Sequence, residues 1–186
     1  MRVVITVLVV ALAALTGCSS STETPEAPVQ STFIPVAADE VRPAKVSIPA
    51  LDVEAPIIDR GLQPSGEMEV PPDEKEVGWY VNSPAPGRPG PSVLTAHVNW
   101  KGKDGPFAKL DQLKAGNRVT VEAVSGARAE FAVDRVETHP KDAFPADAVY
   151  ADTPDPQLRL VTCGGDFDPA AHSYKENVIV FAKLVS

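Results

Sequence analysis

Leu158-Arg159-Leu160-Val161-Thr162-Cys163-Gly164-Gly165 is the stretch around which the rest of the chain is organised. It is a short apolar run that ends in a cysteine and two glycines. Its composition predicts a mostly buried strand that stops where a backbone turn begins. We expect Thr162 and Cys163 at the C-terminal lip of this strand, where the two glycines leave room for a group to approach the sulfur. The sequence therefore places the chemistry at Cys163.

Short apolar pieces separated by turn residues lie on both sides of this stretch. Residues 118–124 and 128–137 alternate between apolar and polar positions around Ser125-Gly126, which predicts a β-hairpin. Residues 92–98 and 177–184 have the composition of two further strands. We count about eight strands in all, and a closed or nearly closed β-barrel is the natural arrangement for them.

Composition supports a single mainly β domain. The 186 residues include 19 prolines and 12 glycines, which favour many turns, and helical patterns are weak and short, at 105–110 and 147–150. We therefore expect one or two short helical turns beside the barrel. The chain is acidic, with 25 Asp and Glu against 17 Lys and Arg, which argues against a nucleic-acid partner.

The N-terminus predicts export. A basic start is followed by an apolar stretch and then by Leu15-Thr16-Gly17-Cys18, which resembles the lipobox of bacterial lipoproteins. We expect residues 1–17 to be a signal peptide, Cys18 to be lipidated, residues 18–40 to form a flexible Ser/Thr/Pro/Glu-rich tether, and residues 41–186 to form the domain. A plain membrane anchor is the alternative, but the apolar run is shorter than the ~20 residues of a spanning helix. In either case the domain works outside the cytoplasm and is tethered to the membrane.

Cys163 is the thiol that remains once Cys18 is lipidated, although the simplest interpretation would pair the two in a disulfide. A lone extracytoplasmic thiol is unusual. Its alternative role is that of a buried, inert core cysteine. Its position beside two glycines favours a reactive thiol.

A nucleophile of this kind needs a proton carrier and a cation. A free cysteine is only a few per cent ionised at neutral pH, and a neighbouring histidine raises that fraction and protonates the departing amine. His97, near the end of a predicted strand, is the best candidate; His139 and His172 lie in loops and are better explained as solvated. Lys175 is the candidate cation, with a solvated turn lysine as the alternative. A structural histidine is the alternative role for His97.

Several pieces of the chain, in their order, resemble the sortases, a family of bacterial cysteine transpeptidases with an eight-stranded barrel. The first pieces are the strand with Leu94-Thr95-Ala96-His97-Val98, the strand that ends in Thr162-Cys163 and the apolar last strand. Further pieces look like the actinobacterial class F branch; they are Ser47-Ile48-Pro49-Ala50-Leu51-Asp52-Val53-Glu54-Ala55-Pro56-Ile57, Val77-Gly78-Trp79-Tyr80, Pro140-Lys141-Asp142-Ala143-Phe144-Pro145 and Thr162-Cys163-Gly164-Gly165. The resemblance covers about residues 43–184.

The resemblance implies an activity. Such enzymes cut a Leu-Pro-x-Thr-Gly type sorting motif between Thr and Gly, hold the acyl group as a thioester, and pass it to an amine or to water. Cys163 would be the nucleophile and His97 the acid and base. The resemblance implies that residues 138–157 recognise the sorting peptide and that the residues beside the substrate are Thr162, Thr95, Ala96 and Asn177.

One position departs from the family. An Arg is expected at the start of the last strand, but the chain has Asn177 there and no Arg after Cys163. Lys175 is the nearest cation, and on a regular strand it would face the same way as Asn177, roughly 7 Å earlier. Arg159 would lie roughly 13 Å from Cys163 along its own strand, and Arg88 cannot be placed.

Three functions remain open. The first is a membrane-tethered sortase-like transpeptidase or endopeptidase whose partners are an exported polypeptide and an acceptor, either water or an amine from a cell-wall precursor or a pilin-type lysine. The second is a catalytically weak or inactive lipoprotein barrel that acts as a peptide-binding module, because the family Arg is missing. The third, an L,D-transpeptidase, is weak because the nearest upstream histidine, His139, is 24 residues from Cys163. We predict no cofactor and no metal, because the loop carboxylates are typical of solvation rather than of a Ca²⁺ site; they are Asp142, Asp147, Asp152 and Asp155.

Overall fold

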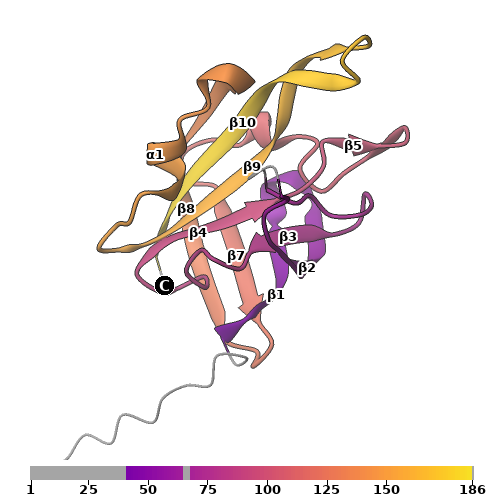
Figure 1. The fold of residues 1–186 in the computed structure, drawn as a ribbon. Helices are drawn as coiled ribbons and strands as arrows, with labels where there is room; N and C mark the ends of the chain where they lie inside the picture. The colour runs from indigo at the N-terminus through magenta and orange to yellow at the C-terminus, as the bar shows by residue number, and fades with distance from the viewer. Residues whose placement is uncertain (1–40, 65–67, 186) are drawn as a thin grey trace, which may run out of the picture. The chain divides into compact units, whose positions relative to one another are not determined.

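A computed structural model describes residues 41–64 and 68–185 of the chain (Figure 1). The predicted signal peptide, Cys18 and the tether up to residue 40 lie outside the described residues. Within the described part, no helix has the length and the apolar character needed to cross a membrane.

Eight strands of the described residues close into a barrel, in the order β1-β2-β3-β4-β9-β10-β8-β7, and β7 pairs with β1 to complete the ring. The pairs β2–β3 and β4–β9 are parallel and the others are antiparallel. The prediction of a mainly β, eight-stranded barrel is confirmed. The strands are β1 (Pro43–Ile48), β2 (Val53–Arg60), β3 (Val77–Tyr80), β4 (Gly90–Thr95), β7 (Arg118–Ala123), β8 (Arg128–Pro140), β9 (Pro156–Asp168) and β10 (Ser173–Leu184).

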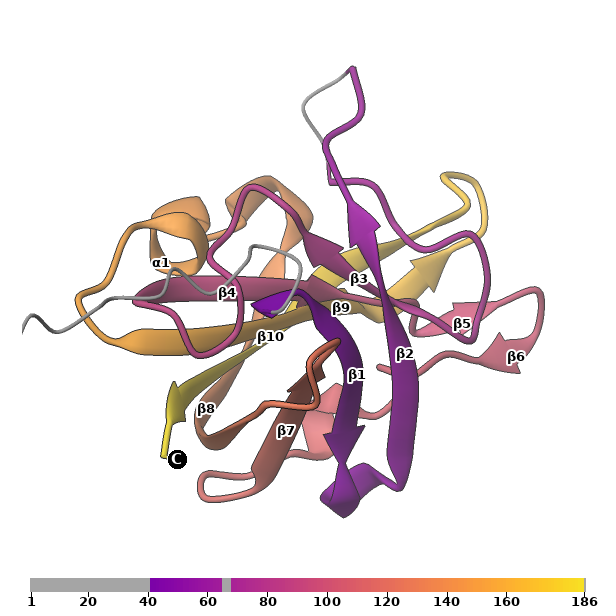
Figure 2. The same ribbon diagram turned by 90° about the horizontal axis from the view of Figure 1, so that it is seen from below.

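The remaining elements are short. The helical pattern at 147–150 corresponds to α1 (Ala146–Tyr150), whereas the turn expected at 105–110 becomes helical only from Leu110. A two-stranded hairpin, β5–β6, lies at the opposite end of β4 from α1 (Figure 2). These elements are β5 (Asn99–Trp100), β6 (Lys103–Asp104) and the 3₁₀ turns η2 (Pro49–Leu51), η3 (Leu110–Gln112) and η4 (Lys141–Ala143).

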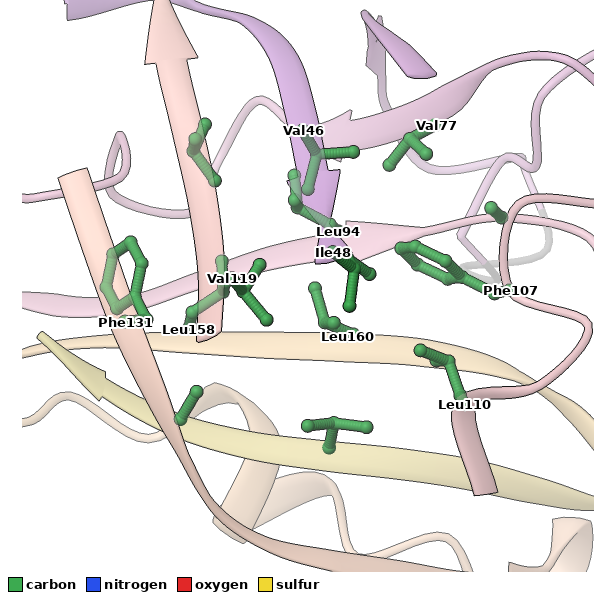
Figure 3. Close-up of a cluster of buried hydrophobic side chains, with 14 of the residues drawn as sticks. Val46, Ile48, Val77, Leu94, Phe107, Leu110, Val119, Phe131, Leu158 and Leu160 are labelled. Atoms are coloured by element: carbon green, nitrogen blue, oxygen red, sulfur yellow. The ribbon is translucent and has the colours of Figure 1, made fainter. Parts of the chain in front are cut away.

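The barrel interior is filled by alternate residues of the strands. Leu158 and Leu160 of β9 point inward with Leu94 of β4 and Phe131 of β8, and each of the four is at most 1% exposed (Figure 3). Alternation on a strand sends the intervening residues to the outer face. The predicted hairpin at 118–137 is confirmed, because β7 and β8 pair as antiparallel neighbours. Its alternating pattern supplies inward-facing residues to the barrel.

The outer face of β4, β9 and β10 is also buried. Val93, Ile179 and Phe181 form a second apolar cluster with Val149 of α1. This two-sided burial explains why Val178 to Ala182 is an unbroken apolar run rather than an alternating one. It also identifies the outer face, where α1 packs, as the face on which odd-numbered residues of β9 lie.

Two predicted strand ends are wrong. β4 ends at Thr95, so His97 lies beyond the strand rather than on it. β9 does not stop at Cys163 but continues to Asp168, because its pairing with β10 extends as far as Ser173. Cys163 therefore lies inside a long strand.

The two glycines after Cys163 are also needed for the packing of β9 against β10. A Cβ at Gly164 would lie 2.6 Å from Cγ2 of Val178, and a Cβ at Gly165 would lie 2.7 Å from Cδ of Glu176. Gly165 has a φ of +69°, which favours glycine. Glycine at both positions thus allows the close approach of β9 and β10, and both glycines also line a cavity of about 370 Å³ together with Cys163.

Candidate active site

Cys163 is a partly buried free thiol in the middle of β9. It shares the outer face with Val161, and its partner across the antiparallel pair with β10 is Asn177. On the other side of β9, the parallel pairing with β4 ends at Thr95 and Val161. A nucleophile there has a neighbouring strand on one side and the end of β4 on the other.

His97 follows β4 on that open side. The register pairs Thr95 with Val161, and Ala96 still donates its N–H to the Val161 carbonyl at 3.4 Å. His97 and Cys163 each follow two residues after this last pair. The two side chains line two cavities together.

The His97 ring is oriented by a backbone carbonyl. Its Nε2 is 2.8 Å from the carbonyl oxygen of Pro71, and the ring packs on Trp100 with centroids 4.7 Å apart. Because a carbonyl oxygen only accepts, Nε2 donates and therefore carries a hydrogen. In the neutral ring Nδ1 is then the nitrogen with a free lone pair.

The backbone of His97 is fixed as well. Its carbonyl accepts the N–H of Phe107 at 3.3 Å, and Gly105 donates to the carbonyl of Val98 at 3.0 Å. A Cβ on Gly105 would clash with the His97 carbonyl, reaching its carbon at 2.8 Å. Close packing against Gly105 therefore fixes the backbone of His97, which is not paired in a strand.

The larger of the two shared cavities is a groove of about 520 Å³ on the outer face, which we call the outer groove. All four residues predicted beside the substrate line it together with Cys163 and His97; they are Thr95, Ala96, Thr162 and Asn177. Apolar side chains form its walls, among them Met68, Phe144, Tyr150 and Val161. The Thr162 hydroxyl also donates to the Ala96 carbonyl at 2.8 Å, which ties β9 to the segment that carries His97.

The second shared cavity, of about 270 Å³, has aromatic walls formed by Trp100, Phe167 and Tyr174. We call it the aromatic pocket. His172 also lines it, with a φ of +48°, and the side chain is exposed. His139 lies elsewhere, because its Nε2 is 2.8 Å from a carboxylate oxygen of Glu137. His97 is thus the histidine that shares both cavities with Cys163.

Lys175 is not brought to the groove. The pairing of β9 with β10 shifts register here, because Gly165 and Asp166 of β9 lie opposite the single residue Lys175, and the extra residue of this bulge belongs to β9. Lys175 is exposed, and it is not among the residues that line the outer groove or the aromatic pocket. Lys175 therefore shares neither cavity with Cys163, and its role as the cation of the site stays a prediction.

The two arginines considered from the sequence are placed away from Cys163. Arg159 is buried, 4% exposed, beneath α1, where its Nε donates to the carbonyl of Ala148 at 3.3 Å. Its guanidinium packs on Phe181, and burial lowers the pKa of Arg159 to about 10, so it stays charged at neutral pH. Arg88 lines a separate pocket with Pro86 and Ala129.

One cation in the groove was missed. Lys141, in the 3₁₀ turn η4, lines the outer groove with Cys163, His97 and Asn177. The sequence signal was present in the segment Pro140-Lys141-Asp142, but only the pairing of Pro140 with Glu176 places that turn beside β10. Within the described residues, no group of three or more His, Cys, Asp or Glu side chains has a metal-binding arrangement.

Comparison with known proteins identifies the family. Residues 46–185 match the sortase domain family. Similar solved structures include sortase C-1 from Actinomyces oris (22% identity, TM-score 0.59, 77% of this chain and 73% of that one) and a lid mutant of sortase A from Corynebacterium diphtheriae (22%, 0.60, 77% and 70%). A sortase transpeptidase from Clostridium perfringens is 18% identical, with a TM-score of 0.58 over 78% of this chain and 79% of that one. No curated protein matches the sequence.

Residues 46–185 therefore have the fold of a cysteine transpeptidase, and the Cys163 thiol and the His97 imidazole line the groove on its outer face. The chain belongs to the sortase family.

Proposed function

We propose that the protein is a membrane-anchored, extracytoplasmic sortase that cleaves a Leu-Pro-x-Thr-Gly type motif and transfers the acyl group to an amine or to water. The observation that carries the proposal is that Cys163 and His97, from two neighbouring segments, line the same two cavities. Cys163 is the nucleophile and His97 the general acid and base.

The reaction proceeds in two balanced steps. The Cys163 thiolate attacks the Thr carbonyl carbon, and the resulting tetrahedral intermediate collapses to a thioester as the Thr–Gly bond breaks. Protonated His97 gives its proton to the departing glycine amine. An acceptor amine or water then attacks the thioester, loses its proton to His97, and releases the thiolate. Because Nε2 is engaged with the Pro71 carbonyl, Nδ1 is the nitrogen that exchanges this proton.

The two cavities suit the two substrates. The outer groove has apolar walls at Met68, Phe144 and Tyr150, which fit the Leu-Pro part of a sorting peptide, with Thr95, Ala96, Thr162 and Asn177 beside the reacting carbonyl. The aromatic pocket reaches Cys163 from a different side and would admit the acceptor. We place the protein in the class F branch on the motif pieces quoted above.

Anchoring is part of the proposal. Residues 1–17 are the signal peptide, Cys18 carries the lipid, and residues 18–40 lift the domain from the outer face of the cell membrane. Metabolic labelling with a clickable fatty acid tests this: label should appear in the wild type and be absent from Cys18→Ala. Equal labelling of both would contradict it.

The central experiment uses a quenched Leu-Pro-x-Thr-Gly peptide with the wild type and Cys163→Ala. Cleavage by the wild type that disappears in the variant, with a thioester adduct detected by mass spectrometry, supports the enzyme. A panel of motifs varied at each position then tests the class F assignment.

A peptide-binding module without turnover is the second candidate. It is favoured by the neutral Asn177 beside Cys163 and by the fact that Lys175 is not among the residues lining the outer groove. Tight binding of the same peptide without cleavage, equal in wild type and Cys163→Ala, would support this candidate instead.

A further inference from the structure

Acyl transfer at Cys163 creates a negative charge for which the structure must provide a partner. When the thiolate attacks, the carbonyl oxygen of the substrate becomes an oxyanion, and one well-placed donor typically contributes 10²–10³-fold to kcat. Asn177, the direct neighbour of Cys163 on β10, is neutral. This inference rests on the proposed function and asks which group of the chain supplies a positive charge there.

Lys141 lies in the outer groove itself. It begins the turn η4, directly after Pro140, which pairs with Glu176 at the start of β10. Cys163 is one strand further across the sheet, opposite Asn177. Lys141, Cys163, His97 and Asn177 consequently line one cavity.

The ammonium group of Lys141 is anchored but not neutralised. Its Nζ donates to the hydroxyl of Ser173 at 2.7 Å. A lysine ammonium has three donor hydrogens, so two remain for other acceptors. Among the residues that the structure describes, no carboxylate oxygen lies within 4.0 Å of this Nζ. The full charge is therefore available to the groove.

The other cations near the site are less suitable. Lys175 does not line the outer groove, and Arg159 donates to backbone and side-chain oxygens beneath α1. Lys101 lines the aromatic pocket from the exposed tip of β5–β6, with its Nζ 5.4 Å from the centre of the Trp100 ring. Lys141, in contrast, lines the outer groove, its Nζ is anchored on Ser173, and two of its donor hydrogens remain free.

We propose that Lys141 is the catalytic cation of this enzyme and that its Nζ donates to the oxyanion of the tetrahedral intermediate while Ser173 holds it in place. Lys141 thus supplies the positive charge that Asn177 does not. The interaction exists only while the carbonyl oxygen is charged, so its loss lowers kcat and leaves KM nearly unchanged.

The test compares Lys141→Met with Lys175→Met, which removes the same charge from a residue that does not line the outer groove. With the quenched sorting peptide, Lys141→Met should lower kcat by about 10²-fold with KM within about 3-fold, and Lys141→Arg should recover at least about a tenth of the rate. Lys175→Met should stay within about 2-fold of the wild type. The rate of Cys163 alkylation by iodoacetamide should stay within about 2-fold in all variants, which reports an intact fold and thiol.

The outcomes are separable. An unchanged kcat in Lys141→Met, a loss confined to KM, or a large loss in Lys175→Met instead would each overturn the role of Lys141 while leaving the sortase activity in place. A wild-type protein that binds the peptide but never cleaves it removes the proposed function, and the Lys141 role with it.

Discussion

His97 is held at a position that no strand ladder fixes. β4 ends two residues earlier, and the histidine backbone is held by hydrogen bonds from Phe107 and by close packing against Gly105. The geometry of the acid and base therefore depends on a small residue that takes no part in the chemistry.

Gly105→Ala should disturb the active site strongly although it adds only one methyl group. The added methyl group would meet the carbonyl of His97, so that segment must shift, and we expect a loss of about 1–3 kcal/mol in the free energy of unfolding. Peptide cleavage should fall at least about 10²-fold, because a displacement of about 1 Å in a catalytic group is costly. Denaturant unfolding and kinetics measure the two effects.

Gly61→Ala is the matched control for this substitution. A Cβ at Gly61 would lie 3.8 Å from a carboxylate oxygen of Glu69, which is an ordinary contact. It should change the unfolding free energy by no more than about 0.5 kcal/mol. Equal effects of the two alanines would show that close packing at Gly105 does not position His97.

At the scale of elements, α1 forms part of the groove wall although it is only five residues long. A helix this short is not stable by itself. It is held by Val149 in the outer apolar cluster and by the hydrogen bond from Arg159 to the carbonyl of Ala148. The wall that carries Tyr150 is therefore fixed from below by β9.

Arg159→Leu should loosen α1 while preserving the barrel. The leucine keeps contact with Phe181 but cannot donate to Ala148, so amide hydrogen exchange at 146–150 should accelerate about 10-fold or more. KM for the sorting peptide should also rise, because α1 forms part of the groove wall. Unchanged exchange in α1 would show that apolar packing alone holds the helix.

Strand β8 carries a row of charges on its outward face. Arg135, Glu137 and His139 alternate along it, with Glu137 2.8 Å from the His139 ring and 2.5 Å from Arg135. The hydrogen bond from His139, and then that from Arg135, lowers the pKa of Glu137 below its model-peptide value of 4.5. Folding thus favours the ionised carboxylate.

The pH dependence of stability follows from this shift. The contribution of Glu137 is fully present above pH 4.5 and is lost as the pH falls through the lower pKa of the folded state. The wild type should exceed Glu137→Gln by a few tenths to about 1 kcal/mol in unfolding free energy at pH 5.5, and the difference should shrink toward pH 3. Denaturant titrations of both proteins at each pH measure it. A difference that grows on acidification would reverse the sign and refute the assignment.

For the whole molecule, stability depends on one closed barrel with a filled interior. Phe131 is fully buried among the inward residues, so Phe131→Ala should cost about 3–5 kcal/mol of unfolding free energy. Val124→Ala, at a residue that is 64% exposed, should change it by less than about 0.5 kcal/mol. Two-state denaturant curves give both values, and similar costs for the two variants would mean that the barrel interior is not the main source of stability.

Sequence patterns predicted the parts of this fold that local periodicity controls. The β7–β8 hairpin follows from alternation around Ser125-Gly126, and the apolar runs of β9 and β10 follow from burial on both faces. Cys163 and His97 were also identified, and they do share the groove. Their roles in catalysis remain predictions.

What failed depended on tertiary pairing. The end of β9 is set by its long pairing with β10, which leaves no local signature. Lys141 was passed over because its turn is near Cys163 in space but 22 residues away in the sequence. A sequence gives residue types and spacing along the chain, whereas a site needs neighbours across the sheet.

The carbonyl of Pro71 has a consequence for how the catalytic pair responds to acidity. Many enzymes orient a catalytic imidazole with a carboxylate, which itself takes up a proton in acid and then releases the ring. An amide oxygen has no such transition in the working range, so His97 keeps the same tilt whether the medium is acidic or alkaline. The orientation of His97 therefore does not depend on the protonation state of a neighbouring carboxylate.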